Sequence, residues 1–284
     1  FNIVGLFLFW PFKTKIAQFL EYVIPDIPEP KQLVDFTGDY TEVDVEVVTT
    51  PPRFLLENAL SSTQTATQAV LQELGHLSRI SLEVICHILF LKTEVLSAKD
   101  VSETTISQYN DLDPVDADLL YRKHIKNLYS ELLSFISKIN YKENDEQYQH
   151  VLATCQVIAF KLVSAVKNSH HLQKNLRYYL AKEDSPAQSF YLDLRGYIVY
   201  NLRIAYQIHF DNEHDAANEK IEGNSLYPNL RKIPLSELIE HSREFESQFR
   251  SDVYNALKEN KINGFITSSI LNDLNYSTQI VESL

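Results

Sequence analysis

The sequence predicts an all-α fold, with two antiparallel three-helix bundles preceded by an apolar N-terminal helix and an extended linker. Apolar residues recur with alternating spacings of four and three over most of the chain, which is the period of one helix face. Proline stands at or just after several segment starts, which is typical of the first turn of a helix. Glycine is scarce, at 6 of 284 residues, which argues against a turn-rich all-β fold.

Residues 1–24 are the first predicted element. The first twelve carry no charge and are too few to span a bilayer, which takes about 20 apolar residues. The second half is amphipathic, since one helix face carries Ile16, Phe19, Leu20, Val23 and Ile24. We predict the end of a transmembrane helix that continues into an interfacial helix, and we expect the chain to be the C-terminal part of a longer protein. The alternative is a buried N-terminal helix of a soluble fold.

Residues 25–52 are predicted to be a Pro-rich acidic linker. Five prolines lie in it, at positions 25, 28, 30, 51 and 52. Within it Val43, Val45 and Val47 alternate with acidic residues, which is the period of a strand. A single strand has no partner in a helical domain, so an extended, solvated linker is the prediction.

Residues 53–182 are predicted to form the first three-helix bundle. Its first helix follows Pro51-Pro52 and covers 53–97, with a weak point at Gly75. The second begins at Asp113-Pro114, where an N-cap residue precedes a proline. The third covers about 146–181.

Residues 183–284 are predicted to form the second three-helix bundle. Its helices begin at Asp184-Ser185-Pro186, at Pro234 and at a cap formed by Thr267 or Ser268. A polar loop at about 211–233 separates the first two, and Asn263-Gly264 is a stop signal for the middle helix.

The net charge of −12 argues against a nucleic-acid partner, because phosphate contacts need clustered Lys and Arg. The two cysteines, Cys86 and Cys155, lie in apolar helical patterns and are predicted to be buried, reduced thiols.

One stretch departs from the acidic composition. No Asp or Glu occurs from Gln147 to Lys182, where the chain instead carries Lys161, Lys167, Lys174, Arg177 and Lys182. The first interpretation is charge balance within the chain, with Glu73, Glu83 or Asp118 as partners. The alternative is contact with anionic lipid headgroups.

No catalytic motif was found: the sequence has no glycine-rich phosphate loop, G-x-S-x-G, C-x-x-C or H-E-x-x-H. Glu240 and Glu244 have the i, i+4 spacing that could chelate a cation with His241, Glu246 and, across a bundle, Asp273; a hydrated acidic face is the favoured interpretation. His170-His171 point to different sides of a helix, and His209 and His214 flank a helix end. We therefore predict no catalytic, cofactor-binding or metal-binding residues, and no enzyme.

Several short motifs occur in a fixed order along the chain. They are Phe1-Asn2 through Pro11-Phe12; Thr50-Pro51 with Leu56-Glu57-Asn58-Ala59, followed by Arg79; Asp118-Leu119-Leu120-Tyr121-Arg122; and Thr267-Ser268-Ser269 with Asp273 and Ser277.

This order resembles the C-terminal region of bacterial sodium/phosphate cotransporters, the Na/Pi cotransporter family, which ends in a PhoU-like helical domain. The resemblance implies two three-helix bundles and a role in regulating phosphate uptake. Some PhoU-like domains bind metal clusters through E-x-x-x-D motifs, for which Glu240 and Glu244 are only an approximate match. In that family the third helix tends to carry acids, whereas here it has none.

The resulting expectation is a cytosolic regulatory domain of a sodium-dependent phosphate transporter in the bacterial inner membrane, with residues 25–284 in the cytoplasm. Its partners would be the membrane domain of the same protein and, through the N-terminal segment, the lipid bilayer; a homodimer is also compatible with the sequence. The alternative function is a free-standing helical adaptor or scaffold without a transport role.

Overall fold

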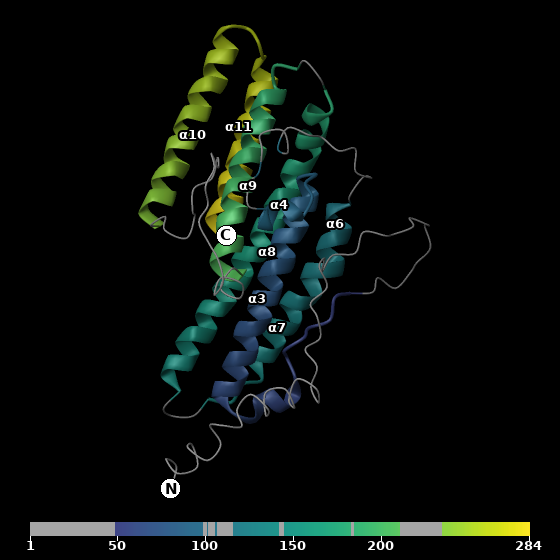
Figure 1. Ribbon diagram of the computed structural model, residues 1–284, viewed down its shortest axis with the longest axis vertical. Helices are drawn as coiled ribbons and strands as arrows, with labels where there is room; N and C mark the ends of the chain where they lie inside the picture. Colours follow the sequence, from purple (N-terminus) through teal and green to yellow (C-terminus); the bar gives the residue numbers. More distant parts are fainter. Residues whose placement is uncertain are drawn as a thin grey trace, which may run out of the picture. The chain divides into compact units, whose positions relative to one another are not determined.

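The computed structural model describes residues 49–98, 101, 106, 116–141, 145–182, 185–210 and 235–284. All regular elements in these ranges are helical, so the predicted all-α fold class is confirmed (Figure 1). The predicted helix at 1–24, the alternating valines at 43–47, the Asp113-Pro114 start and the loop at 211–233 lie outside the described residues.

The described elements follow the chain in this order: η2 (Glu57–Ser61), α3 (Thr63–Ile88), α4 (Glu94–Ser97), α6 (Ala117–Leu120), η3 (Tyr121–Lys126), α7 (Asn127–Ser137), α8 (Glu146–Leu180), α9 (Gln188–Phe210), α10 (Leu235–Lys258) and α11 (Gly264–Ser283). Here η2 is a short 3₁₀ helix and η3 is a π-helical turn between α6 and α7.

The predicted single helix over 53–97 is wrong. The regular α-helix begins at Thr63, where the Ser62 side chain accepts a hydrogen bond from the Thr65 backbone N–H, and ends at Ile88. Phe90 has a φ of 58°, which takes the chain out of the helix before the short α4. The helix runs through Gly75 without a break, so the predicted weak point is wrong as well.

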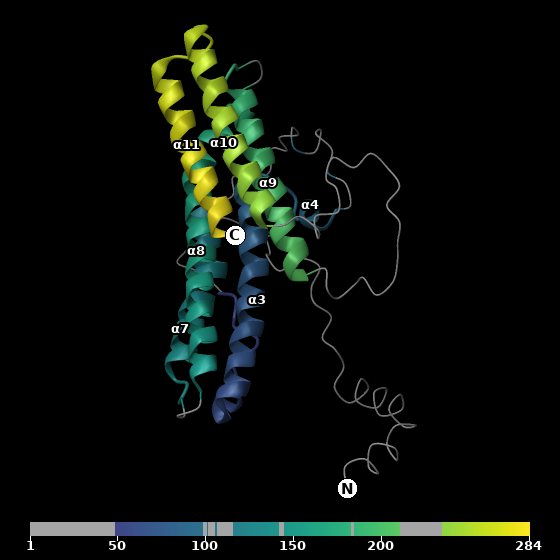
Figure 2. The same ribbon diagram turned by 90° about the vertical axis from the view of Figure 1, so that its left-hand side faces the viewer.

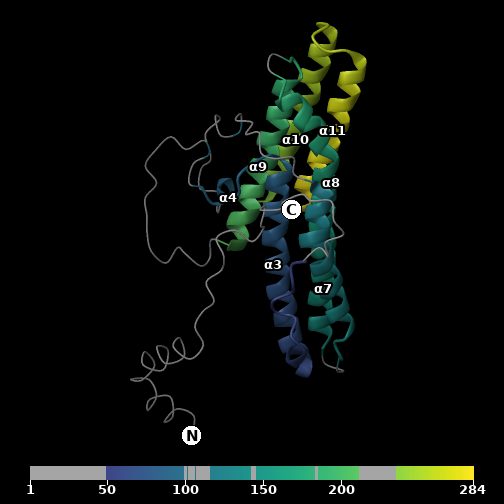
Figure 3. The same cartoon turned by 90° about the vertical axis from the view of Figure 1, so that its right-hand side faces the viewer.

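The predicted third helix matches α8 closely, and this helix links the two halves of the chain. It packs against α3 and α7, and also against α9 and α11 (Figures 2 and 3). Helices α9, α10 and α11 also contact one another, as do α3, α7 and α8. Division into two separate three-helix bundles at 182/183 stays a prediction, because α8 contacts helices of both halves.

The predicted cap of the last helix is also wrong. The Asn263 side chain accepts a hydrogen bond from the Ile266 backbone N–H, at 2.9 Å, and so begins α11. Asn263 therefore starts the last helix instead of stopping α10, which has already ended at Lys258. Thr267 lies inside α11, where its hydroxyl donates to the Asn263 carbonyl.

Two buried arginines of α9 hold the segment that follows α3. Arg195 donates to the carbonyls of Phe90 and Ile106, and Arg203 donates to those of Val95 and Ala98. Their guanidinium groups thus satisfy main-chain acceptors that the end of α3 and the short α4 leave without helical partners.

Candidate functional site

The outward side of α8 carries an exposed line of residues at helical spacing. Val157, Phe160, Ser164, Lys167, His171, Lys174 and Tyr178 are separated by alternating steps of three and four, so they share one side of the helix, and all but the half-buried Ser164 are exposed. Val157, Phe160 and Tyr178 are 56, 59 and 57% exposed, although large apolar side chains are usually covered. We call Val157, Phe160, Lys167, His171, Lys174 and Tyr178 the α8 face.

Basic residues dominate the charge of this region. Lys167 and Lys174 belong to the α8 face, and Lys161 and Arg177 lie on either side of it on the same helix; all four are exposed. The Lys167 ammonium lies 5.2 Å from the centre of the Tyr121 ring, and Lys161 donates to the Glu282 carbonyl at 3.3 Å. Neither contact supplies a negative charge.

The acids predicted to balance these cations have other partners. Glu73 contacts His76 at 2.8 Å, Glu83 lies 3.5 Å from Arg79, and Asp118 lies 2.9 Å from Arg122. Within the described ranges, no ion pair joins a carboxylate to a basic residue of α8. The prediction of internal charge balance is therefore wrong for the described residues.

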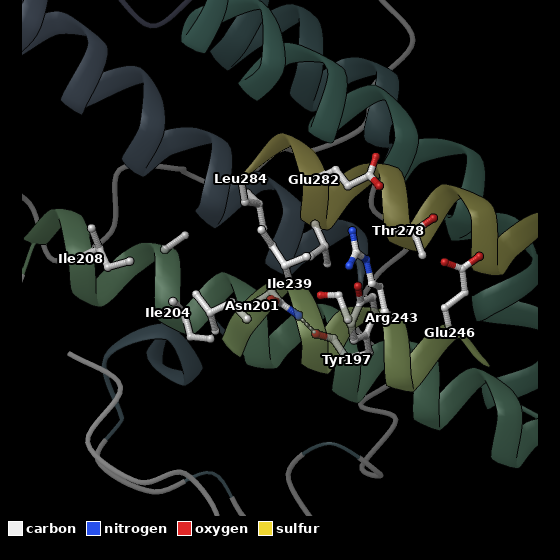
Figure 4. A pocket seen from close by; sticks show the side chains of 14 residues that line it. Tyr197, Asn201, Ile204, Ile208, Ile239, Arg243, Glu246, Thr278, Glu282 and Leu284 are labelled. Atoms are coloured by element: carbon white, nitrogen blue, oxygen red, sulfur yellow. Dashed lines mark hydrogen bonds between the residues drawn. The ribbon is translucent and has the colours of Figure 1, made fainter. Parts of the chain in front are cut away.

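A cavity of about 490 Å³ lies between α9, α10 and α11 (Figure 4). Ile204, Ile208 and Ile239 contribute to its apolar lining, while Arg243 and Glu282 are among its charged residues. The Asn201 side-chain amide, which also lines the cavity, donates a hydrogen bond to the Tyr197 backbone carbonyl of the same helix at 2.9 Å. The volume falls in the range of small-molecule sites, but the lining residues offer no nucleophile–base pair.

Asp273 occupies a different place from the one predicted. It is 1% exposed and its Oδ2 accepts hydrogen bonds from the Tyr191 hydroxyl at 2.6 Å and from the Asn175 amide at 2.9 Å. It therefore joins α11 to α8 and α9 instead of facing Glu240 and Glu244 of α10. The motif Thr267-Ser268-Ser269 with Asp273 lies at this junction, where Ser269 also accepts from Asn175.

Two neighbours influence how this centre ionises. Burial raises the pKa of Asp273, while the hydrogen bonds from Tyr191 and Asn175 act in the opposite direction. Burial and the adjacent carboxylate raise the pKa of Tyr191, so its hydroxyl remains a proton donor in the hydrogen bond. Among described atoms, Asp273 Oδ1 has no hydrogen-bond partner.

The acidic group considered for metal binding does not form a chelating set. Glu240, His241 and Glu244 are exposed on α10, and Glu246 contacts Arg250 at 2.6 Å. No group of three or more potential metal ligands occurs among the described residues. The imidazoles of His170 and His171 lie 6.0 Å apart between ring centres, and His171 stacks on Tyr276 instead.

The placement of the remaining candidate residues is partly described. His214 and the His209 side chain lie outside the described residues. Cys86 and Cys155 are free and buried, which confirms the prediction of buried reduced thiols. Burial raises the pKa of both thiols, so neither has the thiolate character of a reactive cysteine.

Sequence reasoning missed the buried arginines Arg195 and Arg203. Their spacing of eight places both on one side of α9, among the apolar positions of that helix, and this was a usable signal. The exposed residues Val157 and Phe160 could not be distinguished from core positions, because only the packing of α11 and α3 shows which side of α8 stays uncovered.

By length and composition, α8 is the one helix in the described ranges that could cross a bilayer. Its most apolar 18-residue window has a mean hydropathy of 1.3, and 39% of that window is buried. A core helix of a soluble protein meets the same criterion, so this is weak support for a membrane span.

Comparisons with known proteins identify no relative. No protein-family model, no curated protein and no solved structure matches the chain.

Proposed function

We propose that this chain is a cytosolic PhoU-like regulatory domain of a sodium-dependent phosphate transporter in a bacterial inner membrane. It acts by binding rather than by catalysis, docking through the α8 face against the membrane domain of the same protein or a partner held at the membrane. The observation that supports it is the α8 face itself, an exposed line of apolar, aromatic and basic side chains on the longest described helix.

The exposed apolar residues supply a reason to dock. Fully covering a side chain such as Val157 or Phe160 contributes about 1.5–3 kcal/mol to association. Both are more than half exposed in the free chain, so most of that contribution is still available. No described element covers these two side chains fully, although α3, α7, α9 and α11 pack against other sides of α8.

Two residues of the motifs that carry the family resemblance, Thr50 and Asp273, lie at structural junctions. Thr50 contacts His124 at 2.8 Å, and its backbone N–H donates to the Lys123 carbonyl, which attaches the start of the described chain to η3. Asp273 joins three helices. These roles fit a binding module whose polar residues hold helices together.

Regulation by docking requires that the docked contact differ between transport states. A domain that binds two conformers of the transporter with equal affinity does not change the equilibrium between them. The test is sodium-driven phosphate uptake by the full-length protein after deletion of residues 49–284. We expect a changed dependence of uptake on external phosphate. Unchanged uptake at every phosphate concentration would contradict the proposal.

A sharper test replaces only the docking residues. The double substitution V157S/F160S should alter the phosphate dependence of uptake in the same direction as the deletion. The matched control is Y254S/F265S, which removes two other exposed aromatic side chains, 54 and 84% exposed, from α10 and α11. If both double variants behave alike, the α8 face has no special role.

The alternative function, a free-standing adaptor, predicts a different distribution in the cell. The whole chain 1–284 would then be found in the cytosol after fractionation, whereas the proposed function requires association with the membrane fraction.

A further inference from the structure

We propose that the α8 face, with the flanking Lys161 and Arg177, binds the anionic headgroups of a lipid bilayer. The inference rests on the proposed function and extends it, because a face that docks at a membrane domain also lies near the lipid headgroups around that domain. It is carried by the arrangement of basic and apolar side chains on α8.

The first step is the sign of the charge. The chain contains 38 acidic and 26 basic residues, yet no acid occurs between Gln147 and Lys182. A membrane leaflet with anionic lipids presents a single sign of charge over its whole plane. The part of α8 after Glu146 carries no acid and so has no carboxylate that such a plane would repel.

The second step is the geometry. Lys161, Lys167, Lys174 and Arg177 lie along one continuous helix, and the sixteen steps from 161 to 177 correspond to about 24 Å at the rise of an α-helix. Phe160 and Tyr178 lie at the two ends of this basic stretch and are exposed on the same side as Lys167 and Lys174. Aromatic side chains beside lysines are typical of the boundary between headgroups and acyl chains.

The third step is that the cations remain available. The contacts of Lys161 and Lys167 are with a carbonyl and an aromatic ring, and Lys182 similarly lies 5.5 Å from the Tyr178 ring centre. The side chains of Lys174 and Arg177 make no hydrogen bond or ion pair with any residue in the described ranges. Headgroup phosphates can therefore approach without first displacing a carboxylate.

A second copy of the chain is a poorer occupant. The most acidic described helix, α10, intersperses its acids with Arg243, Arg250 and Lys258, and Glu246 is already bound to Arg250 at 2.6 Å. Such a mixed surface would place like charges opposite the α8 cations. Dimer formation through α8 would therefore overturn the inference.

The experiment measures binding of the purified 1–284 chain to sedimented vesicles. One set of vesicles is phosphatidylcholine alone, and the other contains about one quarter phosphatidylglycerol. The test variant is K161Q/K167Q/K174Q/R177Q, and the control K92Q/K138Q/K258Q/K261Q removes four exposed cations from other elements. All three proteins share residues 1–24, so any binding by that segment is common to them. Circular dichroism and thermal unfolding verify that the variants fold.

We expect the wild type and control to bind the anionic vesicles, with affinity that falls as salt is raised, and the test variant to bind at least about tenfold more weakly. Equal binding by the test variant and the control would overturn the inference. Equal binding to both vesicle compositions would also overturn it. So would light scattering that shows the test variant to have lost self-association while its vesicle binding is unchanged.

The two proposals can fail separately. If the test variant alters phosphate uptake while the wild type ignores anionic vesicles, the α8 face meets a protein, and only the lipid inference is overturned. If vesicle binding depends on the four cations while deletion of 49–284 leaves uptake unchanged, the lipid inference stands and the transport function is contradicted.

Discussion

Glu73 and Asp273 are both buried carboxylates, at 0 and 1% exposure, but their surroundings differ. Glu73 uses both oxygens: Oε2 accepts from the backbone N–H groups of Arg53 and Phe54, each at 2.8 Å, and Oε1 contacts the His76 ring at 2.8 Å. Asp273 uses one oxygen for Tyr191 and Asn175, and its Oδ1 has no partner among described atoms.

The difference teaches that burial alone does not define a functional carboxylate. Glu73 accepts hydrogen bonds from two successive backbone N–H groups in a non-helical segment and so joins residues 53–54 to α3. Asp273 joins side chains of three helices and keeps one acceptor unused, which makes its ionisation sensitive to burial. The following predictions test this contrast, beginning with the largest expected effect.

Glu73→Ala should cause the largest loss, about 3–5 kcal/mol in the free energy of unfolding, because it leaves a buried imidazole and two backbone donors unpaired. Urea denaturation monitored by circular dichroism measures the change. The control is Glu57→Ala, at an exposed position, which should shift the unfolding free energy by less than about 0.5 kcal/mol. A loss below about 1 kcal/mol for Glu73→Ala would show that segment 53–54 is not held by this carboxylate.

Asp273→Ala should cost less, about 2–3 kcal/mol, since it leaves the Tyr191 hydroxyl without its acceptor while the Asn175 amide keeps Ser269, and it removes an oxygen that had no partner among described atoms. The same urea titration applies. Tyr191→Phe in the Asp273→Ala background separates the two effects: it should recover part of the loss, because the unpaired hydroxyl is then gone. A greater loss than that of Glu73→Ala would reverse the proposed contrast.

The pH dependence of stability should distinguish the two carboxylates further. Because the pKa of Asp273 is raised in the folded chain, the unfolded chain releases this proton first as pH rises. Its contribution to stability is therefore complete below the unfolded pKa and is lost as pH rises through the folded pKa. The wild type minus Asp273→Asn difference in unfolding free energy should fall by about 1.4 kcal/mol per unit of pKa shift over that window. A difference that is flat between mildly acidic and neutral pH would contradict the raised pKa.

Gly75→Ala should give the smallest effect and the opposite sign. A Cβ at Gly75 would meet nothing within 4 Å, and the residue lies in the interior of α3, so alanine should stabilise the chain by about 0.5–1 kcal/mol. Thermal unfolding detects this as a higher midpoint. This prediction sharpens the comparison, because the substitution expected to lower the unfolding free energy most, Glu73→Ala, and one expected to raise it, Gly75→Ala, then lie two residues apart in α3. Destabilisation by alanine would mean that this side of α3 is covered.

The periodic apolar residues predicted the fold class well. Leu128 and Leu132 of α7, and Leu152, Cys155 and Leu162 of α8, are buried as the helical period requires, whereas Ile158, which the same period places inward, is 40% exposed. The ends of helices were less predictable, because Asn263-Gly264 fits both a stop and a start signal, and only the hydrogen bond from Ile266 decides between them. The positive φ of Phe90 has no sequence signal, since it depends on contacts with α9 from more than one hundred positions along the chain.

The candidate site was predictable in composition but not in orientation. The acid-free stretch is visible in the sequence, whereas the side of α8 that remains exposed depends on how α11 and α3 pack. Asp273 was considered as a residue opposite Glu240 and Glu244, but its partners are Asn175 and Tyr191, from helices that sequence spacing does not relate to it.

The π-helical turn η3 has a consequence for changes in chain length. A π turn holds one residue more than the α-helical turn it replaces, and here it precedes the buried side of α7, which includes Leu128 and Leu132. Removing one residue between Tyr121 and Lys126 would convert the turn to ordinary α-helix while α7 keeps its orientation. A single deletion within α7 would instead rotate everything after it by about 100° and expose Phe135. The turn η3 is therefore the place, between α6 and the end of α7, where natural variants that lack one residue should be tolerated best.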